Sequence, residues 1–135
     1  MEEIVIIIVQ SFENFYVHQR RNDKKRFPGF YGLGAGGKVE PGEDITKAAR
    51  RELKEELRLE SEVEKLFDFD FPEGPYKVHV YRTPYVGEGV LPLCAEFKWG
   101  GWMNLSEIDG LASKGELCPD TKIAYERFKN EFFKH

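Results

Sequence analysis

Runs of apolar residues, continuous in one segment and alternating in others, predict the strands of a sheet. IVIIIVQ at residues 4–10 is a continuous β-branched run, and FYVHQRR at 15–21 follows it after a turn at Glu13 and Asn14. These two segments should form an opening hairpin. Three later strands are expected from similar patterns, at residues 63–71, 76–86 and 95–105.

Helical periodicity replaces these runs in two places. Apolar residues recur at helical spacing from Asp44 to about Leu57, and again over residues 119–134. The apolar positions of the second helix are Ile123, Tyr125, Phe128, Phe132 and Phe133. Ser106 can N-cap a short helix before this segment. The order of the elements predicts an α/β (α+β) fold, with a mixed β-sheet covered by helices on both sides.

A basic, glycine-rich segment, here called the basic loop, separates the hairpin from the first helix. NDKKRFPGFYGLGAGG at residues 22–37 passes through Pro28 and Gly29 into a short glycine-rich strand. It offers few side chains and much backbone. The cations around its start could attract phosphate groups or simply be solvated, and they are Arg20, Arg21, Lys24, Lys25 and Arg26.

Length and composition narrow the class of protein. The 135 residues fit a single domain, 1–135, and a hydrophobic content of 41% is enough to form a core. A formal net charge of -4 gives no global basic field, so we expect a small substrate rather than polymeric nucleic acid. The sequence leaves open whether the chain is a monomer or a homodimer.

The N-terminus and the cysteines bear on the cellular compartment. MEEIVIIIVQ lacks both the basic start of a signal peptide and the length of a membrane span, so we expect a cytoplasmic protein with no membrane association. Cys94 and Cys118 have neither CxxC spacing nor a histidine cluster nearby. We expect both to be free thiols with packing roles.

The first helix carries its acids on one edge. At about 100° per residue, Glu52, Glu55 and Glu56 share an edge, while most basic residues of the helix fall on the far side. A solvated charged helix is one interpretation, since Arg51 and Glu55 form an i,i+4 pair. However, Glu52 has no cation four residues away and meets like charge at Glu56. Clustered carboxylates of this kind favour a divalent cation.

The carboxylates and the glycine pair before them suit one class of metal. Oxygen ligands without thiolate or imidazole favour Mg²⁺ or Mn²⁺ over zinc, and magnesium also binds substrate phosphates. A turn at Gly36 and Gly37 would let the backbone approach metal and phosphates closely. The helix alone leaves the metal site and the solvated surface both open.

The spacing of these residues resembles a known signature. Gly37, five residues, Glu43, seven residues and then RELKEELRL at 51–59 is similar to the Nudix hydrolase box, G-x5-E-x7-R-E-U-x-E-E-x-G-U with U apolar. The resemblance implies a Nudix-type α/β/α sandwich, with a mixed sheet between helices. It also implies hydrolysis of a nucleoside diphosphate linked to another moiety, with Mg²⁺ or Mn²⁺ as the cofactor.

The resemblance assigns roles by position within the box. Glu52, Glu55 and Glu56 would be metal ligands, and the Gly36 carbonyl would join them. Arg51 would orient a ligand carboxylate through a charge-assisted hydrogen bond. The alternative role for Arg51 is that of a solvated ion-pair partner.

Two further acids have roles implied by the same resemblance. Glu43 would brace the loop against the helix, or else be a solvated ion-pair partner. Glu96, six residues before Trp102, resembles an acid that many family members place before a strand tryptophan. A solvent-facing strand glutamate is the alternative for Glu96. The general base is then either a box glutamate or an acid outside the box.

Arg58 occupies the position of the last box glycine, and every other fixed position matches. A glycine there lets a helix end in a left-handed residue, a conformation that costs other side chains roughly 1 to 2 kcal/mol. The rest of the box keeps its register. We therefore predict that Arg58 accepts the left-handed conformation.

Two other functions remain open. The basic loop, Ala35-Gly36-Gly37 in place of a common Pro-Gly-Gly, and the closing GELCPDTKIAYERF resemble the isopentenyl diphosphate isomerase-like branch. However, FYGLGAGG lacks the catalytic cysteine that the isomerases carry before the box. The other alternative is a module that binds a nucleotide without cutting it, and the complete set of box glutamates argues against it.

The identity of the substrate is not set by a motif. Five aromatic residues could stack on a base or belong to the core, namely Phe30, Tyr31, Tyr81, Trp99 and Trp102. His18 and His79 lie in alternating strand patterns. We expect these histidines to be half-buried polar neighbours rather than catalysts.

Overall fold

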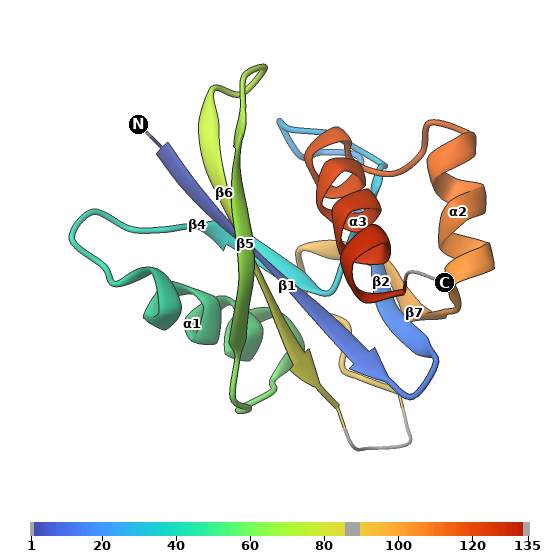
Figure 1. Ribbon diagram of the computed structural model, residues 1–135, viewed down its shortest axis with the longest axis horizontal. Coiled ribbons are helices and arrows are strands. Elements are labelled where there is room, and N and C mark those ends of the chain that lie inside the picture. Colours follow the sequence, from blue (N-terminus) through green and yellow to red (C-terminus); the bar gives the residue numbers. More distant parts are fainter. Residues whose placement is uncertain (1, 86–89, 134–135) are drawn as a thin grey trace.

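The computed structural model describes residues 2–85 and 90–133, which form a seven-stranded mixed sheet and three helices (Figure 1). The strands are β1 (Glu2–Ser11), β2 (Asn14–Arg20), β3 (Tyr31–Leu33), β4 (Ala35–Lys38), β5 (Glu64–Phe71), β6 (Tyr76–Pro84) and β7 (Phe97–Met103). The helices are α1 (Ile45–Leu57), α2 (Leu105–Ser113) and α3 (Pro119–Phe132). α1 covers one face of the sheet, and α2 and α3 lie on the other (Figure 1). The described helices are all too short or too polar to cross a membrane.

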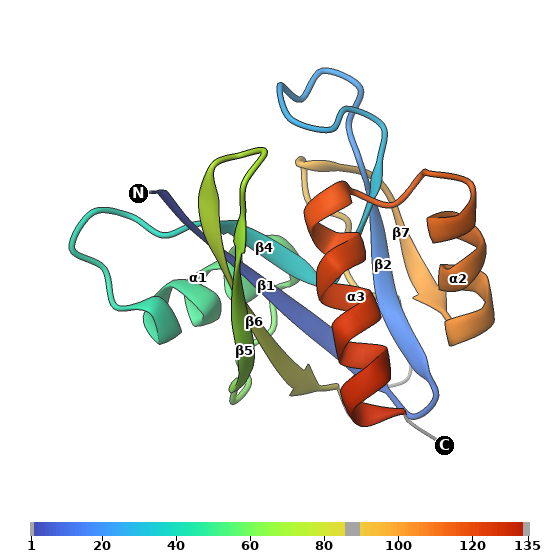
Figure 2. The ribbon, with the colours of Figure 1, turned by 45° about the horizontal axis from the view of Figure 1, so that its top comes forward.

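β1 and β2 meet at their hairpin and then diverge. Gln10 pairs with Phe15 and Ser11 with Asn14, and beyond this point the two strands have different neighbours. β1 pairs with β6 in parallel and with β4 in antiparallel orientation. β2 pairs with β3 on one side and β7 on the other, both antiparallel. The short strands β3 and β4 therefore occupy the opening between the two long strands (Figure 2).

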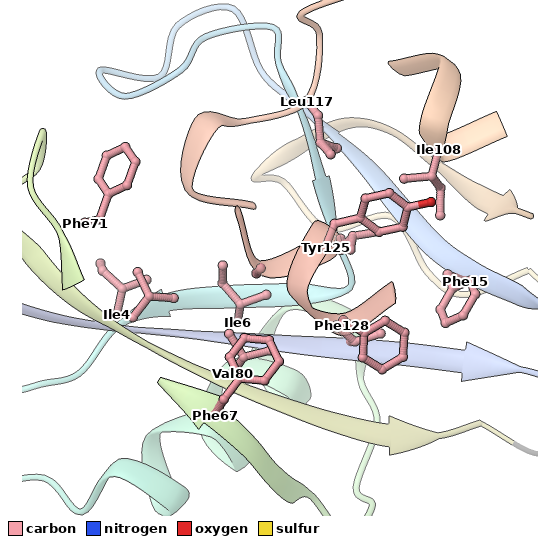
Figure 3. Packing of buried hydrophobic residues seen from close by; sticks show 14 of the residues in the cluster. Ile4, Ile6, Phe15, Phe67, Phe71, Val80, Ile108, Leu117, Tyr125 and Phe128 are labelled. Atoms are coloured by element: carbon pink, nitrogen blue, oxygen red, sulfur yellow. The ribbon is translucent and has the colours of Figure 1, made fainter. Parts of the chain in front are cut away.

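The continuous apolar run of β1 supplies both faces of the sheet. Ile6 belongs to the core cluster that packs against α2 and α3, where Phe128 of α3 also lies (Figure 3). Val5 and Ile7 belong to a second cluster, which packs against Leu53 of α1. Because both faces of β1 are covered, its sequence is apolar without alternation.

The short helix α2 begins earlier than the sequence predicts. Asn104, not Ser106, is its N-cap: the Asn104 side chain accepts a hydrogen bond from the Glu107 N–H at 2.9 Å. The Glu107 carboxylate accepts one in return from the Asn104 N–H at 3.0 Å. This reciprocal capping box satisfies two backbone donors that a cap at Ser106 would leave open.

The predicted strands are confirmed, with ends that differ. The predicted strand at 95–105 is shorter, because the Phe97 N–H donates to the Cys94 carbonyl at 3.2 Å in a turn that precedes β7. The last residue of the predicted strand at 76–86 lies outside the described residues. Cys94 and Cys118 are both free thiols, as expected.

The buried face of α3 matches the prediction in part, because Tyr125 and Phe128 are buried as expected. Ala124 and Phe128, four residues apart, both belong to the core cluster that also contains residues of β1. Ile123 and Phe132, predicted on the apolar face, are 41% and 40% exposed. The small side chain of Ala124 faces the sheet, and Ile123, one position away, is turned out of the contact.

Candidate active site

α1 keeps the box residues in register through both of its ends. The Asp44 side chain caps the helix by accepting a hydrogen bond from the Lys47 N–H at 3.1 Å. At the other end Arg58 has left-handed backbone, with φ 58° and ψ 29°, which confirms the prediction. Its N–H donates to the Lys54 carbonyl at 3.0 Å. The helix therefore ends in the geometry that glycine usually provides, although the residue is arginine.

Two carboxylates of α1 lie against the backbone of β4. Glu56 Oε1 accepts a hydrogen bond from the Gly36 N–H at 2.8 Å. Glu52 fills the space beside Gly37, where an added β-carbon would lie 2.6 Å from the carboxyl carbon. The expectation of a turn at this glycine pair is wrong, because both glycines lie on β4 and pair with β1. Because Gly36 and Gly37 have no side chains, the carboxylates can reach the bare backbone of β4.

Arg51 joins Glu52 to the loop that precedes α1. Its Nε and Nη2 donate to the two carboxylate oxygens of Glu43 at 2.8 and 3.0 Å, and its Nη1 donates to Glu52 at 2.8 Å. Glu43 also accepts a hydrogen bond from the Glu40 N–H at 3.0 Å. The Arg51 guanidinium holds the pKa of Glu43 well below its usual range, at about 2. The carboxylate of Glu52 is thus held in one orientation by Arg51.

Glu55 shares a hollow of the surface with Glu52 and Glu56, but it is the most exposed of the three box acids. Its side chain is 59% exposed, and Arg51 Nη1 donates to it at 3.3 Å. Over residues 2–85 and 90–133, no three His, Cys, Asp or Glu side chains form a group that could hold a metal ion.

Glu96 lies in the turn that directly precedes β7, one residue short of the strand that was expected to hold it. Its carboxylate is exposed and forms an ion pair with Lys24 of the basic loop. It lines the same cleft as Glu52 and Glu56. The fold thus brings Glu96 to the acids of α1, although it is distant from them in sequence.

A cleft of about 660 Å³ lies where the two halves of the sheet diverge, with apolar residues of β1 and β3 in its lining. Cations also line it, and they are Arg20, Lys24, Lys25, Arg26 and Lys38. The acids in its lining are Asp23, Glu52, Glu56, Glu96 and Asp120. The cleft therefore offers both a cationic surface for phosphate oxygens and a carboxylate cluster.

Several residues of the lining were not predicted as site residues. His18, Cys118 and Asp120 all contribute to the cleft. Cys118 and Asp120 lie in the closing stretch GELCPDTKIAYERF, whose resemblance gave them no role. β2 and the start of α3 approach the box only in the folded chain. His18 and His79 are buried, at 7% and 5% exposure, rather than half-buried as expected.

The five aromatic residues proposed as base-stacking candidates lie elsewhere in the described structure. Tyr81 is buried in the core cluster beside α1, and Trp102 packs against Tyr16 there. Trp99 is partly exposed and meets Tyr31 edge to face at 6.1 Å. The aromatic residues in the lining of the cleft are instead Phe27 and Phe97.

The electrostatics of Glu52 and Glu56 suit a divalent cation. Burial raises the pKa of both carboxyls, and for Glu56 to about 8. The charges of Glu52 and Glu96 raise the pKa of Glu56 further, while the Gly36 N–H opposes this effect. A bound cation would relieve the repulsion among these acids. The all-oxygen donor set and the close approach allowed by Gly37 fit Mg²⁺ or Mn²⁺.

Comparison with known proteins assigns the family. The family model of the NUDIX domain matches residues 2–127. The chain belongs to the Nudix family. A relative, an uncharacterized Nudix hydrolase of Streptomyces coelicolor, is 34% identical over 119 residues. This match covers 84% of the chain but 65% of that Nudix protein.

Solved Nudix structures share the fold. The crystal structure of a MutT protein from Methanosarcina mazei superposes with a TM-score of 0.78 and 22% identity, over 99% of this chain and 96% of that one. A bifunctional NMN adenylyltransferase/ADP ribose pyrophosphatase from Francisella tularensis, complexed with AMP and a Mn ion, gives a TM-score of 0.75 and 21% identity. That match covers 96% of this chain and 41% of the other. The α/β/α sandwich predicted from the sequence is therefore confirmed.

Proposed function

We propose that this Nudix domain hydrolyses a nucleoside diphosphate linked to another moiety, with a divalent metal ion. The observation that carries the proposal is the meeting of Glu52 and Glu56 at the bare backbone of β4, in a cleft that also presents the cations of the basic loop. A phosphoanhydride carries charge that repels a nucleophile, so its hydrolysis needs both features.

The proposed metal ligands are Glu52, Glu55 and Glu56, with the Gly36 carbonyl beside them. When bound, Mg²⁺ or Mn²⁺ would neutralise phosphate charge and make a coordinated water more acidic. Arg51 holds the Glu52 carboxylate by a 2.8 Å hydrogen bond. Glu43 in turn fixes Arg51 through both of its oxygens.

The remaining cleft residues have roles in binding and proton transfer. Lys24, Lys25 and Arg26 line the cleft and would attract the diphosphate. The proton of the attacking water passes either to a box glutamate or to Glu96, which faces the cleft beside Lys24. These residues together supply the positioning and charge that phosphoryl transfer requires.

The activity of a protein with a similar fold supports the substrate class. The Francisella tularensis protein is an ADP ribose pyrophosphatase that holds AMP and a Mn ion. We infer a small nucleotide-type substrate for this chain, with no role for polymeric nucleic acid. A cytoplasmic location is part of the same proposal.

A substrate panel with one isosteric variant tests the proposal. Nucleotide sugars, dinucleoside polyphosphates, (d)NTPs and coenzyme diphosphates are incubated with Mg²⁺ or Mn²⁺, and phosphate or pyrophosphate release is measured. Glu56→Gln keeps the side-chain volume but removes charge and ligand strength, so turnover should fall by orders of magnitude in a folded protein. The exposed Glu62→Gln, which lies outside the cleft, is the control and should keep full activity.

Three results would contradict this function. Full activity of Glu56→Gln, or activity in excess chelator, excludes the proposed metal chemistry. Nucleotide binding by calorimetry without turnover of any panel member would indicate the non-hydrolytic binding module instead.

A further inference from the structure

His18 lines the cleft, but the proposed function gives it no role. It lies on β2, directly opposite Gly32 in the pairing with β3. Its ring stacks on Phe97 of β7, with centroids 4.0 Å apart and planes 6° apart. Two strands that flank β2 therefore hold this ring in place.

The hydrogen bond of His18 fixes its tautomer. Nδ1 lies 2.8 Å from the carbonyl oxygen of Gly34, and a carbonyl can only accept, so Nδ1 carries the proton. Burial lowers the pKa of His18 to about 4, and the charge of Arg20 acts in the same direction. The ring is thus neutral at pH 7, and Nε2 carries a free lone pair.

That lone pair faces the cleft. Among the described residues, every buried side-chain nitrogen or oxygen has a hydrogen-bond partner, and the bond from Nδ1 to Gly34 is the only one that His18 makes. Nε2 must therefore belong to the small exposed part of the residue, which lines the cleft. Gly32 leaves the room for it, since an added β-carbon would lie 2.5 Å from Nε2.

A hydrogen-bond acceptor at this place in the cleft attracts donor groups of a ligand and repels acceptor groups. Phosphate oxygens are acceptors too, so they are repelled by Nε2 and attracted instead by the cations of the basic loop. We propose that His18 is a specificity residue whose Nε2 accepts a hydrogen bond from an O–H group of the sugar attached to the diphosphate. This inference rests on the proposed function and deepens it, because it places the sugar, rather than phosphate, beside β2.

Three variants of His18 separate the acceptor from the structural roles of the ring. Asn keeps a donor for the Gly34 carbonyl but has no atom at the place of Nε2. Phe keeps the stack on Phe97 but has neither nitrogen. Gln loses the ring but can place its amide oxygen near the position of Nε2. The Asn and Phe variants therefore share only the loss of the acceptor.

Binding to two probes gives the measurement. The wild type and the variants are titrated by calorimetry, in the presence of Mg²⁺, with α,β-methylene ADP-ribose and with methylenediphosphonate, which lacks any sugar. His18→Asn and His18→Phe should each bind the ADP-ribose analogue about five- to tenfold more weakly, and His18→Gln should recover part of the loss. Affinity for methylenediphosphonate should stay within about twofold of the wild type, since no lost hydrogen bond touches the phosphonates.

Two further variants complete the test: one is a control at the other histidine, and one displaces Nε2 without changing His18. His79→Gln alters the other buried histidine, which lies on β6 outside the cleft lining, and should leave both affinities unchanged. Gly32→Ala should reproduce the loss seen in His18→Phe, because its β-carbon displaces Nε2 while the Gly32 backbone has no positive φ.

Each contrary outcome overturns the inference. Wild-type affinity of His18→Asn and His18→Phe for the analogue would show that Nε2 has no partner on the sugar. Equal losses for both probes would place the phosphates or a metal-bound water at Nε2, and failure of the wild type to bind the analogue would exclude the sugar contact altogether. Turnover of the substrate panel is measured separately, so hydrolysis that persists in any of these cases leaves the proposed function standing.

Discussion

Arg51 makes more hydrogen bonds than any other side chain of the box helix that the structure describes, and Glu43 receives two of them. The pair is bidentate, a geometry that aligns the planar guanidinium with both carboxylate oxygens. The ionised form of Glu43 is therefore more stable in the folded chain than in the unfolded chain. The lowering of its pKa to about 2 expresses this difference.

The Glu43–Arg51 pair predicts a pH-dependent contribution to stability. Since the folded pKa lies below the ordinary value of 4.5, the contribution is present in full above pH 4.5 and is lost as the pH falls toward about 2. Glu43→Gln should therefore unfold at a lower urea concentration than the wild type at pH 7. The difference between the two urea midpoints should be smaller at pH 3. Urea unfolding at pH 3, 5 and 7 measures both differences.

A second glutamate–arginine pair provides the control. Glu62 lies 3.6 Å from Arg50, and its side chain is 94% exposed, so solvent screens this pair. Glu62→Gln should leave the midpoint unchanged at every pH. A gap between Glu43→Gln and the wild type that is equally large at pH 3 and pH 7 would contradict the prediction.

At the scale of the elements, α1 shows what local sequence determines. Its cap at Asp44 and its apolar stripe depend on neighbours within a few residues, so both ends could be predicted. At α2, Asn104 and Ser106 are both good cap residues, and only the reciprocal bond with Glu107 decides between them. The glycine pair was misassigned because its pairing with β1 is a long-range contact that no local pattern records.

The end of α1 predicts a stabilising substitution. Arg58 holds a left-handed conformation that glycine adopts without steric cost. Arg58→Gly should raise the free energy of unfolding by up to about 1 kcal/mol, after the greater entropy of glycine in the unfolded chain offsets part of the relief. Thermal melts measure the change, and metal affinity should hardly differ.

Arg58→Ala is the matched control for this substitution. It removes the same long side chain but keeps a β-carbon in the left-handed conformation, so it should give little or no stabilisation. A lower melting temperature for Arg58→Gly, or an equal gain for both variants, would show that relief of backbone strain is not the cause.

At the scale of the whole molecule, one contact joins three distant segments beside the cleft. The Tyr76 hydroxyl donates to Asp120 at 2.6 Å and accepts from Arg26 Nη2 at 2.8 Å. The Arg26 guanidinium also lies 4.6 Å from the centre of the Tyr76 ring. β6, the start of α3 and the basic loop are thus held together. Sequence could not predict this junction, or the cleft it borders, because each segment contributes a single ordinary polar residue.

Loss of this junction should weaken substrate binding more than turnover. Tyr76→Phe keeps the ring but removes both hydrogen bonds, so the loop cations are held less firmly while the box carboxylates stay in place. We expect KM to rise about three- to tenfold, with a much smaller change in kcat, and stability to fall by about 1 kcal/mol. Steady-state kinetics on the best panel substrate and thermal melts give both numbers.

Tyr125 offers a matched control. Its hydroxyl donates to Asp109 at 2.6 Å and lies 3.1 Å from the Leu105 carbonyl, between α2 and α3 and outside the cleft lining. Tyr125→Phe should cost similar stability but leave KM unchanged. Equal effects of the two variants on KM would mean that the junction acts only through global stability.

The central place of β1 has a consequence for synthesis of the chain on the ribosome. β1 is translated before its parallel partner β6, which covers residues 76–84. The edge of the apolar run at 4–9 that pairs with β6 therefore stays unpaired until more than half of the domain has been translated. At roughly 5–20 residues per second this wait lasts several seconds, during which an adhesive strand edge is open to other nascent chains. Products that stop before residue 76 keep that edge permanently. They should depend on chaperones for solubility in a way that the finished domain does not.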